Sequence, residues 1–191
     1  SGQTDSFVEE VFMSLVPNFI GGEEGRLAYQ RGERCFDDEH VVAAFQAIAD
    51  LAPYLPPNGS ELTSHDSKQL FLSGKAAMMV GGSWDITLFE TSQPEFKWSI
   101  FAVPPPIGKE RYINFHPDAA IGLNAASTQK EAARVFLEWL ASPELPAMLN
   151  NELPGFFSMN KSLPTLENVH ANTFLSLNWG RELDVRWAYP T

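Results

Sequence analysis

The most informative part of the sequence is Phe71-Leu-Ser-Gly-Lys-Ala-Ala-Met-Met-Val-Gly-Gly-Ser-Trp-Asp-Ile86. Gly74 predicts a helix end, because the C-terminal cap of a helix favours a residue with positive φ. The apolar run from Ala76 to Val80 is short enough for a strand that is covered on both faces. The segment therefore predicts a helix, its end and then a buried strand.

A glycine turn follows this predicted strand. Gly81-Gly82 allows another group to approach the backbone closely, and Ser83 is a residue type that caps helices. Trp84 and Asp85 then fall in the first turn of the next helix. An indole beside backbone amides suits a ligand with an apolar face and a polar rim, such as a sugar ring. The same spacing allows Trp84 to be a core residue next to a tight turn.

These motifs resemble a known family. The run Phe71-x-x-Gly74-Lys75-Ala76-Ala77-Met78, closing on Gly82-x-Trp84, is similar to the family 1 extracellular solute-binding proteins. These are the maltose-binding-protein-like receptors that feed ABC importers. Other motifs follow in the family's order: Gly21-Gly22 after an amphipathic helix, a helix start at Asp37-Asp38-Glu39, Val103-Pro-Pro-Pro106, Ala120-Ile-Gly-Leu-Asn-Ala-Ala-Ser127 and Lys130-Glu-Ala-Ala-Arg-Val-Phe-Leu-Glu-Trp-Leu140-Ala-Ser-Pro-Glu144. The ordered set is more specific than any single motif.

The resemblance implies an α/β fold of the type II periplasmic-binding-protein class, and the alternation of predicted strands and helices agrees with it. It implies that residues 1–118 belong to the C-terminal lobe of a two-lobe receptor. Residues 119–163 are then an excursion into the N-terminal lobe, and residues 164–191 return to the C-terminal lobe. A complete receptor of this kind is roughly twice as long. We therefore expect a partial chain that holds most of the C-terminal lobe.

Periodicity and cap residues predict the individual elements. Helices are expected over 6–16, 38–51, 63–73, 130–140 and 166–177, strands over 98–103 and 119–125, a hairpin over 27–36 and a loop over 108–118. We expect Pro17 and the glycines after it to end the first helix. Thr63 or Ser64 is expected to cap the third helix, with Asp66 or Ser67 in its first turn. Thr128 and Glu131 predict a capping box for a helix that buries Val135, Phe136, Trp139 and Leu140.

Composition excludes several classes of protein. The net charge of −11 leaves no basic surface for a nucleic acid. Cys35 is the single cysteine, so an internal disulfide is excluded. No apolar run approaches the roughly 18 residues of a membrane span. The sequence contains no Gly-x-Ser-x-Gly elbow, no His-Glu-x-x-His and no phosphate-binding glycine loop, so no catalytic residue, cofactor or metal is expected.

The candidate ligand-binding residues are aromatic or polar and lie near turns. The resemblance implies that Trp84 is the stacking residue, with Gly82 and Ser83 beside it. It also implies an aromatic from Phe12, for which a core role is the alternative, and a site-facing loop at Gly155-Phe156-Phe157. Asp85, His116 and Asp118 are candidate hydrogen-bonding partners. The sequence departs from the family at 115–118, where many relatives have small glycine-rich residues.

The resemblance implies a component of an ABC importer that captures a solute, most simply a carbohydrate, between two lobes and delivers it to permease subunits in the membrane. It further implies a periplasmic or extracellular location, with a lipid anchor in the full-length protein as one arrangement. Three alternatives remain open: a carboxylate-based glycosidase domain, a receptor for a cationic solute such as a polyamine, and a sensor or adhesion protein. Apolar surface left bare in a partial chain also predicts a homodimer.

Overall fold

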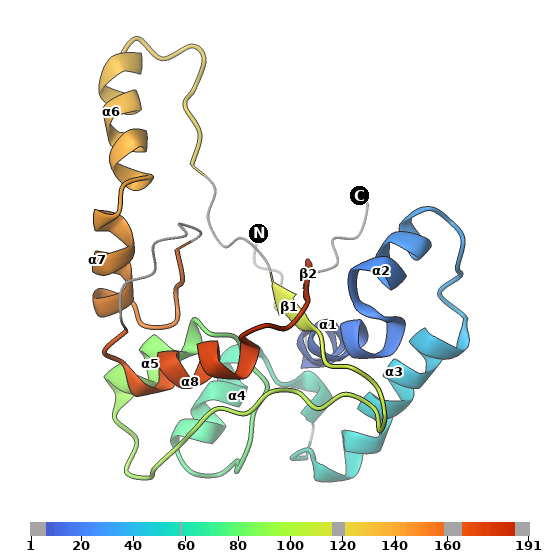
Figure 1. Cartoon of the computed structure of the whole chain (residues 1–191). Helices are drawn as coiled ribbons and strands as arrows, with labels where there is room; N and C mark the ends of the chain where they lie inside the picture. Colours follow the sequence, from blue (N-terminus) through green and yellow to red (C-terminus); the bar gives the residue numbers. More distant parts are fainter. Residues whose placement is uncertain (1–6, 58, 116–120, 159–165, 186–191) are drawn as a thin grey trace. The chain divides into compact units, whose positions relative to one another are not determined.

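The computed structural model describes residues 7–57, 59–115, 121–158 and 166–185 (Figure 1). Contacts within the chain divide it into two compact units. Unit 1 contains the described parts of 1–81, 101–116 and 178–191, and unit 2 contains those of 82–100 and 117–177. Each unit is therefore assembled from segments far apart in the sequence. No helix in the described part of the chain is long and apolar enough to cross a membrane.

The core of unit 1 forms where α1 (Phe7–Ile20) packs on α3 (Glu39–Leu51) (Figure 1). Its buried side chains include Val11, Val16, Val41 and Ala44. The prediction that Pro17 ends α1 is wrong, because the helix continues through Pro17 to Ile20. Ile20 is itself buried, so packing extends the helix past the proline. Gly21 then ends the helix with a φ of +92°.

The predicted hairpin over 27–36 is also wrong, because α2 (Gly22–Gln30) covers its first half. Glu23 and Glu24 occupy the first turn, where acidic side chains complement the positive end of the helix dipole. Arg26 and Tyr29 are buried at helical spacing, which favours the helix over a strand.

The expected start of α3 is confirmed, since the Asp38 carboxylate accepts hydrogen bonds from the backbone N–H groups of His40 and Val41. The Tyr29 hydroxyl donates to the same carboxylate at 2.6 Å. Burial, assisted by the bond to Asp38 and its charge, raises the pKa of Tyr29 to about 12. The cap of α3 thereby also ties it to α2.

The helix before the glycine turn is confirmed as α4 (Ser64–Leu72), with Thr63 and Asp66 forming a capping box. Gly74 follows it with the expected positive φ, +69°. Two 3₁₀ turns, η1 (Ala52–Tyr54) and η2 (Gly59–Glu61), lie between α3 and α4.

The strands of unit 1 lie where a loop was expected. β1 (Ile113–Phe115) pairs in parallel with β2 (Leu183–Val185), with Ile113 opposite Leu183. Asn side chains attach this pair to α1: the Asn18 side-chain oxygen accepts from the Tyr112 N–H, and the Asn114 amide donates to the Met13 carbonyl, both at 2.7 Å.

The three predicted strands over 76–80, 98–103 and 119–125 are not found as paired strands among the described residues, and 119–120 lie outside them. A strand exists through the hydrogen bonds of a neighbouring strand. Apolar runs predict an extended segment, but they do not supply its partner.

Unit 2 contains α5 (Asp85–Ser92), α6 (Lys130–Leu140), α7 (Glu144–Glu152) and all but the last residue of α8 (Val169–Asn178). The predicted capping box of α6 is wrong, because Glu131 binds Arg134 at 3.0 Å and α6 begins without a side-chain cap. The expected burial of its apolar face is wrong too, since Val135 and Phe136 are exposed and none of its residues is fully buried.

One buried ion pair joins α2 to β2. Arg26 Nε lies 2.6 Å from an Asp184 carboxylate oxygen, and the two side chains are only 9% and 2% exposed. Loss of either side chain would leave the charge of the other buried and unpaired, which destabilises the folded state.

We expect Asp184→Asn to lower the free energy of unfolding by about 3–5 kcal/mol, because it leaves the Arg26 charge buried and unpaired. Urea denaturation followed by circular dichroism measures this. The matched control is Glu33→Gln in the exposed Arg31–Glu33 pair, for which we expect a change of about 0–1 kcal/mol. Equal losses in the two variants would contradict this account of the Arg26–Asp184 pair.

Candidate functional site

The glycine turn before α5 is closed by its own residues. The Gly82 N–H donates to the Asp85 carboxylate at 3.1 Å, and the Asp85 N–H donates to the Gly82 carbonyl at 3.1 Å. Asp85 is only 4% exposed. The Gly82 amide, which the sequence suggested for a ligand, and one Asp85 oxygen therefore serve to hold the turn.

The indole of Trp84 lies directly against this turn. A Cβ added at Gly82 would overlap the six-membered ring of Trp84, so glycine is needed for the close approach. The side chain is nevertheless 39% exposed, so it is not a core residue in the structure. The predicted capping role of Ser83 is wrong, because Trp84 itself is the N-cap and no side chain caps α5.

The 153–157 loop packs on the start of α5. Gly155 has a φ of +101°, and a Cβ at this position would overlap the carbonyl oxygen of Ser83. The Thr87 hydroxyl on α5 donates to the Pro154 carbonyl at 2.7 Å. The structure therefore brings the predicted Gly155-Phe156-Phe157 segment and the turn that carries Trp84 together.

The two phenylalanines of this loop are half-buried. Phe157 stacks on Phe174 of α8, with ring centroids 5.5 Å apart and planes 15° from parallel. The ring of Phe157 is therefore committed at least in part to packing against α8.

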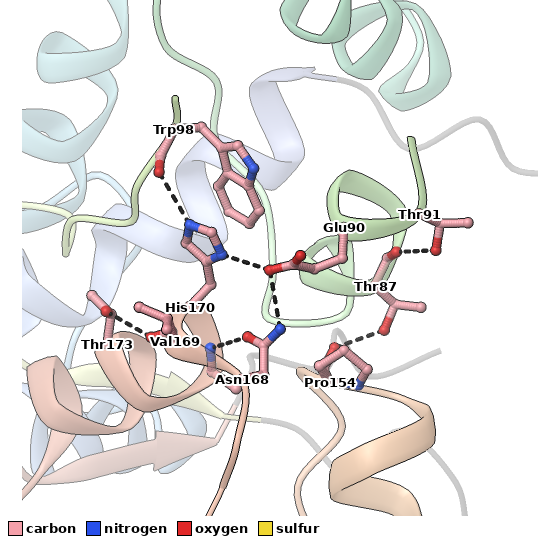
Figure 2. A network of polar contacts seen from close by, with 10 residues as sticks. Thr87, Glu90, Thr91, Trp98, Pro154, Asn168, Val169, His170 and Thr173 are labelled. Atoms are coloured by element: carbon pink, nitrogen blue, oxygen red, sulfur yellow. Dashed lines mark hydrogen bonds and ion pairs between the residues drawn. The ribbon is translucent and has the colours of Figure 1, made fainter. Parts of the chain in front are cut away.

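Sequence reasoning missed a polar network that joins α5 to α8 (Figure 2). His170 Nδ1 lies 2.6 Å from the Glu90 carboxylate, and Nε2 lies 3.1 Å from the Trp98 carbonyl. The Asn168 amide donates to the same Glu90 oxygen at 3.0 Å. The Trp98 and His170 rings stack with centroids 3.6 Å apart. Glu90 and His170 are 80 residues apart, so no local spacing could have indicated this contact.

The network changes the acidity of Glu90. The hydrogen bond from His170 is the main cause that lowers the pKa of Glu90, and the bond from Asn168 adds to it while burial opposes it. Glu90 is therefore ionised at neutral pH.

The remaining predicted site residues are Phe12, His116 and Asp118. Phe12 is buried in the core of unit 1, where its ring stacks on Phe45 with centroids 4.5 Å apart. The structure thus supports the core alternative for Phe12. His116 and Asp118 lie outside the described residues. Within the described ranges no three His, Cys, Asp or Glu residues are grouped so as to hold a metal ion.

The fold is that of a solute-binding protein. The structure is similar to one described as a chitin oligosaccharide binding protein, with a TM-score of 0.74 and 21% sequence identity. The match covers 94% of this chain and 47% of that one, so this chain spans about half the length of the structure it matches. The expected partial α/β fold of the type II periplasmic-binding-protein class is therefore confirmed.

The particular family follows from the sequence match. The model of the family described as bacterial extracellular solute-binding protein matches residues 1–145. The chain belongs to this family, as its motifs indicated. The family and the similar structure are both described as binding proteins.

We expect Gly155→Ala to destabilise the protein by about 2–4 kcal/mol, because a left-handed backbone strains alanine and the methyl group would overlap Ser83. Gly108→Ala is the matched control. Its φ is +77°, but open space surrounds it, so we expect about 1–2 kcal/mol from backbone strain alone. Urea denaturation gives both values, and equal losses would contradict the close approach of Gly155 to Ser83.

Proposed function

We propose that this chain is part of the solute-binding component of an ABC importer and that its solute is a carbohydrate. The receptor captures the solute between its two lobes and delivers it to permease subunits in the membrane. Membership of the solute-binding family supports the binding role. The similar structure, described as binding chitin oligosaccharides, supports a sugar.

The exposure of Trp84 is the observation that carries the proposal. Its ring is pressed against Gly82 while 39% of the side chain stays accessible. A flat apolar surface beside a polar turn suits the C–H face of a pyranose ring. Trp84 is thus the stacking residue, and the adjacent Gly155-Phe156-Phe157 loop provides a second aromatic contact through Phe156.

The position of Asp85 favours a neutral sugar over a polyamine. A cationic solute needs an accessible carboxylate, whereas Asp85 is buried and accepts the Gly82 N–H. In this proposal Asp85 acts indirectly, because it holds the turn that presents Trp84.

Several parts of the proposal concern the whole receptor. In this proposal the receptor acts in the periplasm or outside the cell, and a lipid anchor is one means by which it is attached to the membrane. The receptor catalyses no reaction. The assignment of residues 1–118, 119–163 and 164–191 to the two lobes is part of the same proposal. The exposed apolar side chains of α6 are consistent with the predicted pairing of two copies, which light scattering at several concentrations tests.

We expect Trp84→Ala to weaken sugar binding about tenfold or more, since a large aromatic contact is worth roughly 1.5–3 kcal/mol. The measurement is isothermal titration of the full-length protein against a panel that includes chitin oligosaccharides and maltodextrins. The control is Trp179→Ala, which removes an indole that is 81% exposed in unit 1 and should leave affinity unchanged.

Two results would count against the proposal. Titrations of the wild-type protein that show no binding heat with any sugar would exclude a carbohydrate as the solute. Sugar binding that Trp84→Ala leaves intact would remove Trp84 from the site. Competition by putrescine or spermidine would instead favour the cationic solute.

A further inference from the structure

Each of the two paired strands in unit 1 is preceded by an arginine (Figure 1). Arg111 lies two residues before β1, and Arg181 lies two residues before β2. The strands run in parallel with Ile113 opposite Leu183, and the Ile113 N–H donates to the Glu182 carbonyl at 3.0 Å. This register, extended by two residues, places Arg111 opposite Arg181.

A shared contact with Asn178 independently brings the two arginines together. Arg111 Nη1 donates to the Asn178 side-chain oxygen at 3.2 Å. The Arg181 N–H donates to the Asn178 carbonyl at 3.3 Å, and Gly180, with a φ of +69°, allows the chain to turn between them. All of these residues belong to unit 1.

The arginines lie on the face of the strand pair that α1 and α2 leave open. Successive side chains along a strand point to opposite faces. The ring of Tyr112 lies against Gly22 of α2. The Asn114 amide donates to the Met13 carbonyl of α1. The odd-numbered positions therefore point away from these helices, and Leu183 on that face is 59% exposed.

The two guanidinium groups repel each other. Burial is the main cause that lowers the pKa of Arg111, and the charge of Arg181 lowers it further. The carboxylates of Glu110 and Glu182 act on Tyr112, whose pKa is raised chiefly by burial and then by these charges. Positive charge is therefore concentrated on the open face, and negative charge on the side of Tyr112.

The end of α8 offsets only part of the positive charge of the arginine pair. Asn178 is the last residue of α8, and the C-terminus of a helix carries about half a negative charge. The two guanidinium groups carry two positive charges, because arginine stays protonated at physiological pH. Roughly one and a half positive charges are left over. A phosphate group carries about −1.5 to −2 charges at neutral pH, so its charge matches this excess.

The shape of the pair also suits a phosphate group. A guanidinium is a planar fork that donates two parallel N–H bonds to two oxygens of one oxyanion. Neighbouring strands lie about 4.8 Å apart, so the two forks start close enough to contact the same tetrahedral ion. Arg181 is exposed and Arg111 is half-buried, so a small ion can reach both from the solvent.

We propose that Arg111 and Arg181 form a binding site for a phosphate group, carried by inorganic phosphate or by a phosphate monoester, on the open face of the β1–β2 pair. Asn178 is a positioning residue that orients the guanidinium of Arg111. The site lies within unit 1 and uses none of the residues assigned to the sugar, so it is independent of the proposed function.

The first test is a titration of the full-length protein, labelled with ¹⁵N-arginine, with sodium phosphate at neutral pH and constant ionic strength. We expect the Nε–H resonances of Arg111 and Arg181 to shift along one saturable curve, because both forks contact the same ion. The resonance of Arg31, whose Nε–H donates to Glu33 on the surface of the same unit, should stay unchanged. The three resonances are assigned from the corresponding Arg→Gln variants. Shifts that rise without saturation at all three arginines would overturn the inference.

Two further titrations identify the ligand group. Binding of glycerol phosphate along the same curve would extend the site to phosphate monoesters, and binding of inorganic phosphate alone would assign it to the free ion. Acetate has less charge and fewer acceptor oxygens, so it should bind about tenfold or more weakly. Acetate binding as tight as that of phosphate would overturn the assignment of a phosphate site.

The second test compares two variants that remove the same unit charge. Arg181→Gln should weaken phosphate binding about tenfold or more, because it removes the charge-assisted hydrogen bonds of one fork. Its side chain is exposed, so the variant is expected to fold, which circular dichroism checks. Arg31→Gln, in the exposed pair with Glu33, should leave phosphate affinity unchanged. Equal phosphate affinity in the wild type and Arg181→Gln would overturn the inference, and neither result depends on whether a sugar binds.

Discussion

The close approach of Gly155 to the carbonyl of Ser83 is the constraint on which the candidate site depends. A side chain at 155 would meet that oxygen, and the backbone there has a conformation that only glycine adopts easily. With hydrogen in place of a side chain, the loop reaches the start of α5 and Thr87 can bond to Pro154. The aromatic residues after Gly155 are then held next to the turn that carries Trp84. A second glycine, Gly82, allows the indole of Trp84 to lie against the backbone of the turn, because a Cβ at this position would overlap the ring.

Among the described residues, both units contain an ionic contact between segments far apart in the chain, and the two differ in the basic side chain that they use. In unit 1 the Arg26 guanidinium binds a carboxylate that is 2% exposed. A guanidinium keeps its charge at any physiological pH, so this pair is permanent in the folded state. In unit 2 the imidazole of His170 lies against Glu90, which is 38% exposed. The pair in unit 1 is therefore the more completely removed from water.

The predicted elements divide according to the range of the interactions behind them. α3 begins at the acidic residues expected to start it, and Thr63, one of the two residues expected to cap α4, does so. Both ends depend on bonds between residues two or three positions apart. The strands expected over 76–80 and 98–103 fail, because a strand needs a partner from elsewhere in the chain. The pair that does form, β1 with β2, joins segments some seventy positions apart, and β1 lies inside a stretch expected to be loop. The apolar residues of α6 have the spacing of a helix face, but this spacing does not determine whether another element covers that face, and Val135 and Phe136 are exposed.

The start of α3, the cap of α4, the positive φ of Gly74, the family and the candidacy of Trp84 and the 155–157 loop could therefore be predicted from the sequence. The α3 start, the α4 cap and the φ of Gly74 follow from residue type at short spacing, where local sterics and backbone hydrogen bonds dominate. The family and the candidate site residues followed from the resemblance of the ordered motifs to known proteins. The structure was needed to show that Phe12 is a core residue and that His170 bonds to Glu90. These depend on which distant segments meet. Side-chain burial and partner choice come from packing of the whole unit, which no local pattern contains.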